Sequence, residues 1–302
     1  MKCVVIGANG FIGYQLTKYL LAQHCDVVAL VPRGFSYEHV KVLLVECHEF
    51  ILDTIHSESI PICQNADVIY NMIWVGVNAN ERNNAELQAQ NLLHNIHIVE
   101  FASNHHINKL IVPGSAAQYA CSGRIIDGTG ESAPSDLYSA AKSSVHSYCK
   151  VLCEQKDIEL VWTLITSIYG PGRDDNNLIS YTIKTLLRGE RPSFTGLEQL
   201  WDYLYIDDLM KALYLLGEKG QGGKVYTIGS GKYRQMSEYV RIIRDNINHE
   251  LPLGIGDKPY KNPVIDNQIM DISELVQDTG FQPDWTYEHG IKMVIEWFRN
   301  NM

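Results

Sequence analysis

The first thirteen residues constrain the fold of this chain more than any other segment. A short apolar run, Lys2 to Ile6, is followed by glycines at positions 7, 10 and 13 and then by leucines at helical spacing. In such a strand, turn and helix, Gly7 permits the tight turn, Gly10 lets the backbone approach a phosphate, and Gly13 lets the helix lie close to the strand. The segment predicts a site for a dinucleotide pyrophosphate, and the alternative is an ordinary strand-turn-helix.

Apolar runs typical of strands alternate with amphipathic segments typical of helices along the chain. We expect strands near 2–6, 26–31, 42–46, 67–72, 109–113, 159–166 and 224–228, and helices near 11–23, 85–104, 136–155, 177–188, 207–217, 236–247, 272–279 and 287–300. This alternation predicts an α/β fold, a Rossmann-type doubly wound parallel sheet covered on both faces.

Two segments rich in Pro and Gly, 170–200 and 251–264, interrupt this alternation and predict a smaller C-terminal lobe over the carboxyl ends of the strands. We therefore expect a dinucleotide-binding domain over residues 1–170 and 201–230. The substrate-binding lobe would comprise residues 171–200 and 231–302.

Composition excludes several classes of protein. The formal net charge of −10 disfavours nucleic acid and anionic membranes as main partners, and no apolar run approaches the roughly 20 residues of a membrane span. The seven cysteines lack paired CxxC spacing, and the first residues do not resemble a secretory signal, so we expect reduced thiols and a cytoplasmic protein. No metal is expected, because the histidines at 94, 97, 105 and 106 have no converging carboxylates or cysteines in the sequence.

A serine, a tyrosine and a lysine form the strongest candidate for catalysis. Ser115 ends an apolar strand, and 23 residues later Tyr138 and Lys142 are spaced by one helical turn. A free phenol has a pKa of about 10, and the Lys142 ammonium together with a cationic nicotinamide would lower it by roughly three units, or about 4 kcal/mol. Ser115 would orient the reacting oxygen, although it also fits a cap in a Gly-Ser loop, and Tyr138 with Lys142 also fits a surface pair.

These residues resemble the extended short-chain dehydrogenase/reductases that act on nucleotide sugars, the NAD(P)-dependent epimerases, dehydratases and reductases. The resemblance covers essentially the whole chain, through GANGFIG (7–13), GSAAQY (114–119), YSAAK (138–142), SIYGPG (167–172), WDYLYIDDL (201–209) and MDISELVQDTGFQP (270–283). It implies an enzyme that takes a nucleotide-diphosphate sugar, with a homodimer formed through the helices near 85–104 and 136–155.

The resemblance assigns roles residue by residue. For catalysis it implies Ser115, Tyr138 and Lys142. For the cofactor it implies Gly7, Asn9, Gly10, Phe11, Ile12, Gly13, Asn91, Tyr138, Lys142, Ser167, Ile168 and Tyr169. For the substrate it implies Ser115, Ala116, Asn177, Leu178 and, most weakly, Lys261. Simpler interpretations remain open: Asn91 ties a helix to a loop, Asn177 caps a helix, and Lys261 is solvated.

Departures from the family pattern narrow the reaction. Ala116 and Ala117 stand where 4,6-dehydratases carry an Asp-Glu pair, and Ala116 also replaces the cysteine of fucose-type epimerase/reductases. Trp201 stands where many 4-epimerases carry an arginine that binds phosphate. These departures from the family pattern therefore disfavour dehydration. They also indicate that the diphosphate of the substrate is bound differently from that in the 4-epimerases with this arginine.

The end of the second strand favours NADP(H), with NAD(H) as the alternative. No carboxylate is available there for the ribose hydroxyls, and Arg33 lies where a guanidinium pairs with a 2′-phosphate, unless it is simply a solvated loop residue. With the WDYLYIDDL segment and Ser167, this points to an NADP(H)-dependent reductase of a nucleotide-linked 4-keto-6-deoxyhexose. The alternatives are an NAD-dependent nucleotide-sugar 4-epimerase and, from another class, a non-catalytic dinucleotide sensor or scaffold.

Overall fold

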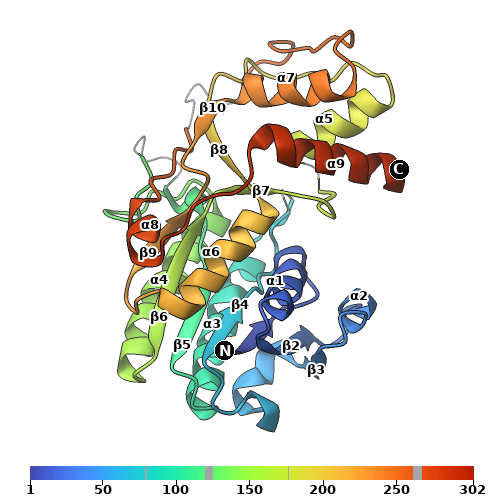
Figure 1. Cartoon of the computed structure of the whole chain (residues 1–302). Helices are drawn as coiled ribbons and strands as arrows, with labels where there is room; N and C mark the ends of the chain where they lie inside the picture. Colours follow the sequence, from blue (N-terminus) through green and yellow to red (C-terminus); the bar gives the residue numbers. More distant parts are fainter. Residues whose placement is uncertain (79, 120–124, 176, 261–266) are drawn as a thin grey trace.

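The computed structural model describes residues 1–78, 80–119, 125–175, 177–260 and 267–302. A seven-stranded sheet forms its centre in the order β3-β2-β1-β4-β5-β6-β9, and every neighbouring pair is parallel (Figure 1). The strands are β1 (Lys2–Ile6), β2 (Asp26–Pro32), β3 (Glu46–Phe50), β4 (Val68–Asn71), β5 (Lys109–Pro113), β6 (Glu159–Ile165) and β9 (Val225–Ile228). The expected doubly wound parallel sheet is confirmed.

Helices cover both faces of this sheet, so its strands are apolar on both sides. α1 (Phe11–Ala22) packs beside α6 (Ile206–Lys219) on one face, and α3 (Ala85–Asn104) beside α4 (Leu137–Gln155) on the other. Alternate residues of β1 divide between two cores: Val5 joins the core under α1 and α6, and Val4 joins the core under α3 and α4.

A second, three-stranded sheet supports the lobe. Its order is β10-β8-β7, with β8 (Leu200–Tyr205) parallel to β7 (Ser167–Tyr169) and antiparallel to β10 (Tyr233–Gln235). α5 (Leu178–Leu187), α7 (Met236–Ile247) and α9 (Tyr287–Asn301) gather at this end of the molecule, and α8 (Ser273–Thr279) packs against β9 and α6 (Figure 1). β7 and β8 thus belong to the small sheet and not to the seven-stranded one.

The third strand differs from its expected position. The apolar residues 42–45 led to a predicted strand over 42–46. The chain instead turns at residues 42–44, with Leu44 at φ +54° and 93% exposed, and β3 begins at Glu46. As an edge strand of the sheet, β3 pairs with β2 alone, and three of its five residues are Glu or His. The short helices α2 (Glu38–Lys41), η1 (Leu52–Ser57) and η2 (Pro61–Cys63) flank this edge region, and η3 (Ala116–Tyr119) follows β5.

The glycine turn after β1 behaves as its spacing predicts. Gly7 has φ +82°, a left-handed conformation that side chains rarely adopt. A Cβ on Gly13 would lie 2.1 Å from the Gly7 carbonyl oxygen, so only glycine allows α1 to start this close to β1. The turn therefore leaves the N-terminus of α1 at the carboxyl end of β1.

Candidate active site

A cavity of about 780 Å³ opens at the carboxyl ends of the central strands, within the usual size range of small-molecule sites. It lies between the glycine turn, the ends of β4, β5 and β6, and the lobe. Of the expected site residues, its lining includes Gly10, Phe11, Ile12, Ser115, Ala116, Tyr138, Lys142, Ser167 and Ile168.

The three candidate catalytic residues converge on this cavity. Ser115 follows β5, and Tyr138 and Lys142 lie one turn apart on α4. Asp136 caps α4: its Oδ1 accepts from the Ser139 backbone N–H at 2.8 Å, and the Ser139 hydroxyl oxygen accepts from the Asp136 N–H at 3.1 Å. This capping box fixes the start of the helix and thereby places Tyr138 in its first turn, facing the cavity.

The surroundings of Tyr138 act on its phenol in opposite directions. Burial raises the pKa of Tyr138 above its usual value, while a hydrogen bond with the Ser115 side chain and the charge of Arg82 lower it. The net direction is upward. The expectation of a lowered pKa assumed both the Lys142 ammonium and a cationic nicotinamide beside the phenol, whereas burial is the largest effect on Tyr138 in this structure.

The Lys142 ammonium is directed away from the Tyr138 ring. Its Nζ donates to the Pro113 carbonyl oxygen at 2.6 Å, lies 3.6 Å from the centroid of the Trp74 ring, and is 5.9 Å from the centroid of the Tyr138 ring. Burial lowers the pKa of Lys142 to about 7. Lys142 therefore has a pKa close to neutral pH, and its ammonium contacts the Pro113 carbonyl and the Trp74 indole.

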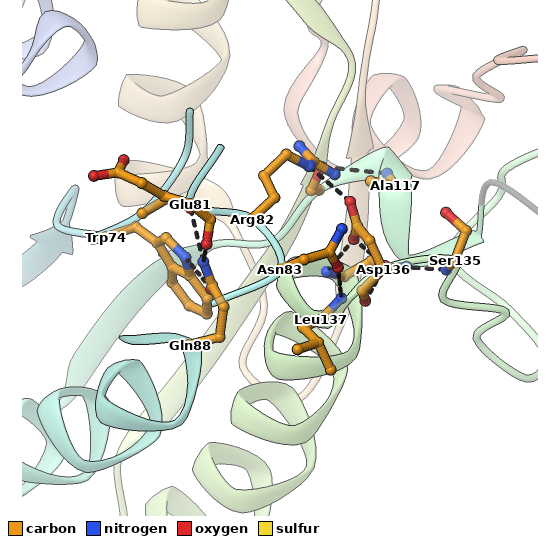
Figure 2. A network of polar contacts seen from close by, with 12 residues as sticks. Trp74, Glu81, Arg82, Asn83, Gln88, Ala117, Ser135, Asp136 and Leu137 are labelled. Atoms are coloured by element: carbon orange, nitrogen blue, oxygen red, sulfur yellow. Dashed lines mark hydrogen bonds and ion pairs between the residues drawn. The ribbon is translucent and has the colours of Figure 1, made fainter. Parts of the chain in front are cut away.

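The loop after β4 supplies two cavity residues that the sequence analysis missed. Trp74 packs edge-on against the Tyr138 ring at 5.8 Å between centroids, and its indole N–H donates to Gln88 at 3.2 Å. Arg82 binds the Asp136 carboxylate at 2.7 Å between Nε and Oδ2, as Figure 2 shows. Their position after the carboxyl end of a central strand was the available signal, because ligands of such sheets bind there.

Only part of the glycine turn lines the cavity on the side expected to bind the cofactor, namely Gly10 and the two residues after it among those described. Asn9 is outside the lining, and its carbonyl oxygen lies 3.1 Å from Nε2 of His39 in α2. Arg33 also lies outside it, after β2, with a 62% exposed side chain and Nε 3.9 Å from a Glu49 carboxylate oxygen. Arg33 is thus exposed at the strand end where the sequence analysis expected it.

Several expected ligand contacts have structural roles in this chain. Asn91 is buried behind the cavity wall and holds the Val75 backbone, accepting from its N–H at 3.0 Å and donating to its carbonyl at 2.9 Å. Tyr169 packs among buried aromatic rings of the small sheet, including Tyr203 and Tyr205. Neither is among the described lining residues, so the simpler interpretation of Asn91 as a tie between helix and loop agrees with the structure.

The expected diphosphate contacts also lie outside the described lining of the cavity. Asn177 caps α5, with its Oδ1 accepting from the Ser180 N–H at 2.9 Å, and Leu178 packs in the small core of the lobe. Lys261 falls outside the described residues. The cations that do line the cavity are Arg82, Lys142 and Arg173, among the residues described.

On the lobe side, Trp201 and Ser167 are joined across two strands. The Trp201 indole N–H donates to the Ser167 hydroxyl at 2.9 Å, and that hydroxyl donates to the Gln268 side-chain oxygen at 3.2 Å. All three residues line the cavity. An aromatic ring thus occupies the wall where the family resemblance leads one to expect an arginine.

The described histidines, cysteines and carboxylates do not gather in threes as metal ligands. His94 binds Asp53 at 3.0 Å, and the rings of His56 and His97 pack at 4.3 Å between centroids with their planes tilted by 41°. Likewise, no helix within the described ranges is long and apolar enough to cross a membrane.

Fold and cavity together define a dinucleotide-binding α/β protein with a serine, a tyrosine and a lysine at the ligand site. The chain belongs to the NAD dependent epimerase/dehydratase family, whose model matches residues 3–229. The family expectation is confirmed, and with it that the protein belongs to a class of enzymes.

Curated relatives match the chain to different extents. A dTDP-glucose 4,6-dehydratase of Escherichia coli is 30% identical over 182 residues, 56% of this chain and 49% of that protein. A putative UDP-glucose 4-epimerase of Methanocaldococcus jannaschii is 26% identical over 309 residues, 99% of this chain and 98% of that protein. The chain thus spans about half the length of the curated dehydratases it matches and nearly all of the putative epimerase.

Among solved structures, the UDP-glucose 4-epimerase of Thermotoga maritima with UDP-glucose superimposes with a TM-score of 0.87. The match covers 100% of this chain and 99% of the other at 20% sequence identity. At this identity the likeness shows the shared fold.

Proposed function

We propose that this protein is an NAD-dependent nucleotide-sugar 4-epimerase, which inverts C4 of a nucleotide-linked hexose. The observation that carries the proposal is the convergence of Ser115, Tyr138 and Lys142 on one cavity with the glycine turn. The comparisons support the epimerase alternative better than the 4-keto-6-deoxyhexose reductase that the sequence analysis favoured, because the similarity to epimerases extends over the full chain.

The residues of the cavity fit a nicotinamide dinucleotide. The N-terminus of α1 offers free backbone N–H groups, and Gly10 has only the Gly7 carbonyl near its missing Cβ, at 3.5 Å. Gly10, Phe11 and Ile12 would hold the pyrophosphate and Lys142 the nicotinamide ribose. When bound, the nicotinamide supplies reversible two-electron oxidation of the C4 alcohol.

The protein residues would handle the proton and the orientation of the sugar. Tyr138 would remove the proton from the C4 hydroxyl and return it after the sugar has presented its other face. The Ser115 hydroxyl, which is already hydrogen-bonded to Tyr138, would align the C4 oxygen of the sugar. Lys142 would supply positive charge beside the tyrosine once it leaves the Pro113 carbonyl.

The described carboxylates of the cavity argue against dehydration, which needs an acid and a base near C5 and C6. Ala116 and Ala117 offer neither, and the lining carboxylates are Asp174 and Asp175. Asp174 pairs with Lys184, and Asp175 pairs with Arg173 at 2.8 Å. Both are committed to ion pairs.

The test is incubation of the purified protein with UDP-glucose and no added cofactor, with the products followed by NMR. UDP-galactose is expected from the wild type, and a loss of about 10³-fold in kcat from Tyr138→Phe, because the proton transfer is lost. Absence of interconversion for UDP-, CDP-, GDP- and dTDP-linked hexoses would overturn the epimerase proposal.

A second candidate is the NADP(H)-dependent reductase of a nucleotide-linked 4-keto-6-deoxyhexose. Arg33 favours it, since its exposed guanidinium follows β2 and has only a 3.9 Å contact with Glu49. Consumption of NADPH with a 4-keto-6-deoxy substrate, together with no epimerase activity, would select this candidate. Arg33→Ala should then raise the KM for NADPH about tenfold and leave the KM for NADH unchanged.

The same proposal includes a homodimer formed through α3 and α4. Leu93, Tyr148 and Val151 on these helices are each more than half exposed in the single chain, which an apolar interface would explain. Sedimentation velocity would measure the assembly, and a monomer at micromolar concentration would contradict it.

A further inference from the structure

The ammonium expected to activate Tyr138 is held at a distance from it in this structure. Lys142 Nζ binds the Pro113 carbonyl and the Trp74 ring, and it lies 5.9 Å from the Tyr138 ring centroid. Burial also lowers the pKa of Lys142 to about 7, so part of its charge is lost at neutral pH. In this structure the Lys142 ammonium is therefore not in contact with the Tyr138 ring, and any cation that does contact the ring acts on the phenol in addition to Lys142.

Arg82 lies directly over the Tyr138 ring. Its guanidinium carbon is 4.1 Å from the ring centroid, nearer than the Lys142 ammonium. Both side chains line the cavity. Burial raises the pKa of Tyr138, and the hydrogen bond with Ser115 lowers it. Of the charged groups that face the phenol, Arg82 and Arg173 lower its pKa and the Asp136 carboxylate raises it. A guanidinium stays protonated throughout the pH range in which proteins are folded, whereas an amine can lose its charge.

The guanidinium is held in place by the helix that carries the tyrosine. Arg82 Nε binds Asp136 Oδ2 at 2.7 Å, while the other oxygen of that carboxylate caps α4 by accepting from Ser139. Both side chains of the pair are mostly buried, at 31% and 19% exposure. One residue, Asp136, thus caps the start of the helix and binds Arg82 (Figure 2). It thereby fixes the guanidinium above Tyr138.

The same loop has a neutral contact to the same helix. Asn83 Oδ1 accepts a hydrogen bond from the Leu137 backbone N–H at 3.1 Å, next to the Arg82 and Asp136 pair in Figure 2. Asn83 ties the loop to α4 without adding charge. In this loop, Asn83 therefore makes a structural contact to α4, and Arg82 makes a charged one.

We propose that Arg82 is a positioning residue for Tyr138, which holds a permanent positive charge over the phenol ring through its anchor on Asp136. The role rests on the proposed function of Tyr138 as the group that moves the C4 proton. It adds a cation from the loop after β4 to the serine, tyrosine and lysine.

The experiment measures the ionisation of Tyr138 directly, by NMR of protein labelled with ¹³Cζ-tyrosine, with the signal assigned by its loss in Tyr138→Phe. In Arg82→Gln the pKa of Tyr138 should rise by about one unit relative to the wild type, since an opposite charge at this range shifts a pKa by one to three units. Arg82→Lys, which restores a charge, should return part of the shift. In kinetic assays, the limb of the pH profile that depends on Tyr138 should move to higher pH by the same amount.

Asn83→Ala is the matched control, because it loosens the same loop without removing a charge. Its Tyr138 pKa should equal that of the wild type, and thermal melting verifies that each variant is folded. An unchanged Tyr138 pKa in Arg82→Gln, or an equal shift in Asn83→Ala, would overturn the proposal. The titration requires no substrate, so it gives an answer even if the protein turns out to lack epimerase activity.

Discussion

The two walls of the cavity are built in different ways. On the cofactor wall, Gly7, Gly10 and Gly13 lie within seven residues, and their contacts are to backbone. On the substrate wall, Trp201, Ser167 and Gln268 meet through side-chain hydrogen bonds across 34 and 101 residues of sequence. The first wall depends on backbone conformation and leaves no room for a Cβ at Gly13, whereas the second depends on side chains that can be exchanged without rebuilding the fold.

The largest effect is expected from Gly13→Ala on the cofactor wall. The new Cβ would meet the Gly7 carbonyl oxygen at 2.1 Å, so α1 or the turn must move. Because the backbone N–H groups of the turn would move away from the phosphates, we expect dinucleotide affinity to fall by about 100-fold, measured by calorimetry with NAD and NADP. Gly10→Ala, whose nearest contact would be 3.5 Å, should keep the wild-type melting temperature. Equal cofactor affinity in Gly13→Ala and wild type would break the comparison.

A smaller and more selective effect is expected on the substrate wall. Trp201→Leu removes the indole that donates to Ser167, so we expect the KM for the nucleotide sugar to rise about tenfold while kcat changes by less than about twofold. Dinucleotide affinity should remain that of the wild type. Trp201→Phe keeps an aromatic ring but lacks the N–H that donates to Ser167. Comparing it with Trp201→Leu therefore distinguishes the contribution of packing from that of the hydrogen bond. A loss of cofactor binding in either variant would show that the walls are not independent.

The smallest effect concerns Lys142, which lies between the two walls. Burial lowers its pKa to about 7 in the folded state, against about 10.5 in the unfolded chain. Between these values the unfolded chain binds more protons, so wild-type stability should rise with pH across this window. Lys142→Met removes the cost of burying the charge and should melt a few degrees higher than the wild type at pH 6, with the advantage shrinking toward pH 10.

Calorimetric melting of both proteins from pH 6 to pH 10 measures this effect. Lys150→Met, at an exposed position of the same helix, serves as the control and should show no such convergence with pH. Melting curves of Lys142→Met and wild type that stay parallel over the whole range would contradict the assignment of a buried, partly neutral Lys142.

The sequence by itself determined the sheet, its helices and the three candidate catalytic residues. Regular alternation and the Gly7 to Gly13 spacing depend on local backbone geometry, which residues close in sequence specify. Where the pattern was read from apolarity alone it was wrong. The apolar residues 42–44 form a turn, and the edge strand begins at Glu46 with mostly polar residues, because an edge strand is less buried than a central one.

Only the tertiary structure decided what surrounds those candidates. Asn91 holds a loop, Lys142 binds a carbonyl and an indole, and Arg82 lies over Tyr138 from a loop 54 residues before its anchor, Asp136. Such contacts join residues far apart in the chain, and no local pattern of a single sequence records which side chain will fill a given gap. The pKa of a buried phenol depends on the summed effects of these neighbours. It therefore follows from tertiary packing and not from the spacing of residues in the sequence.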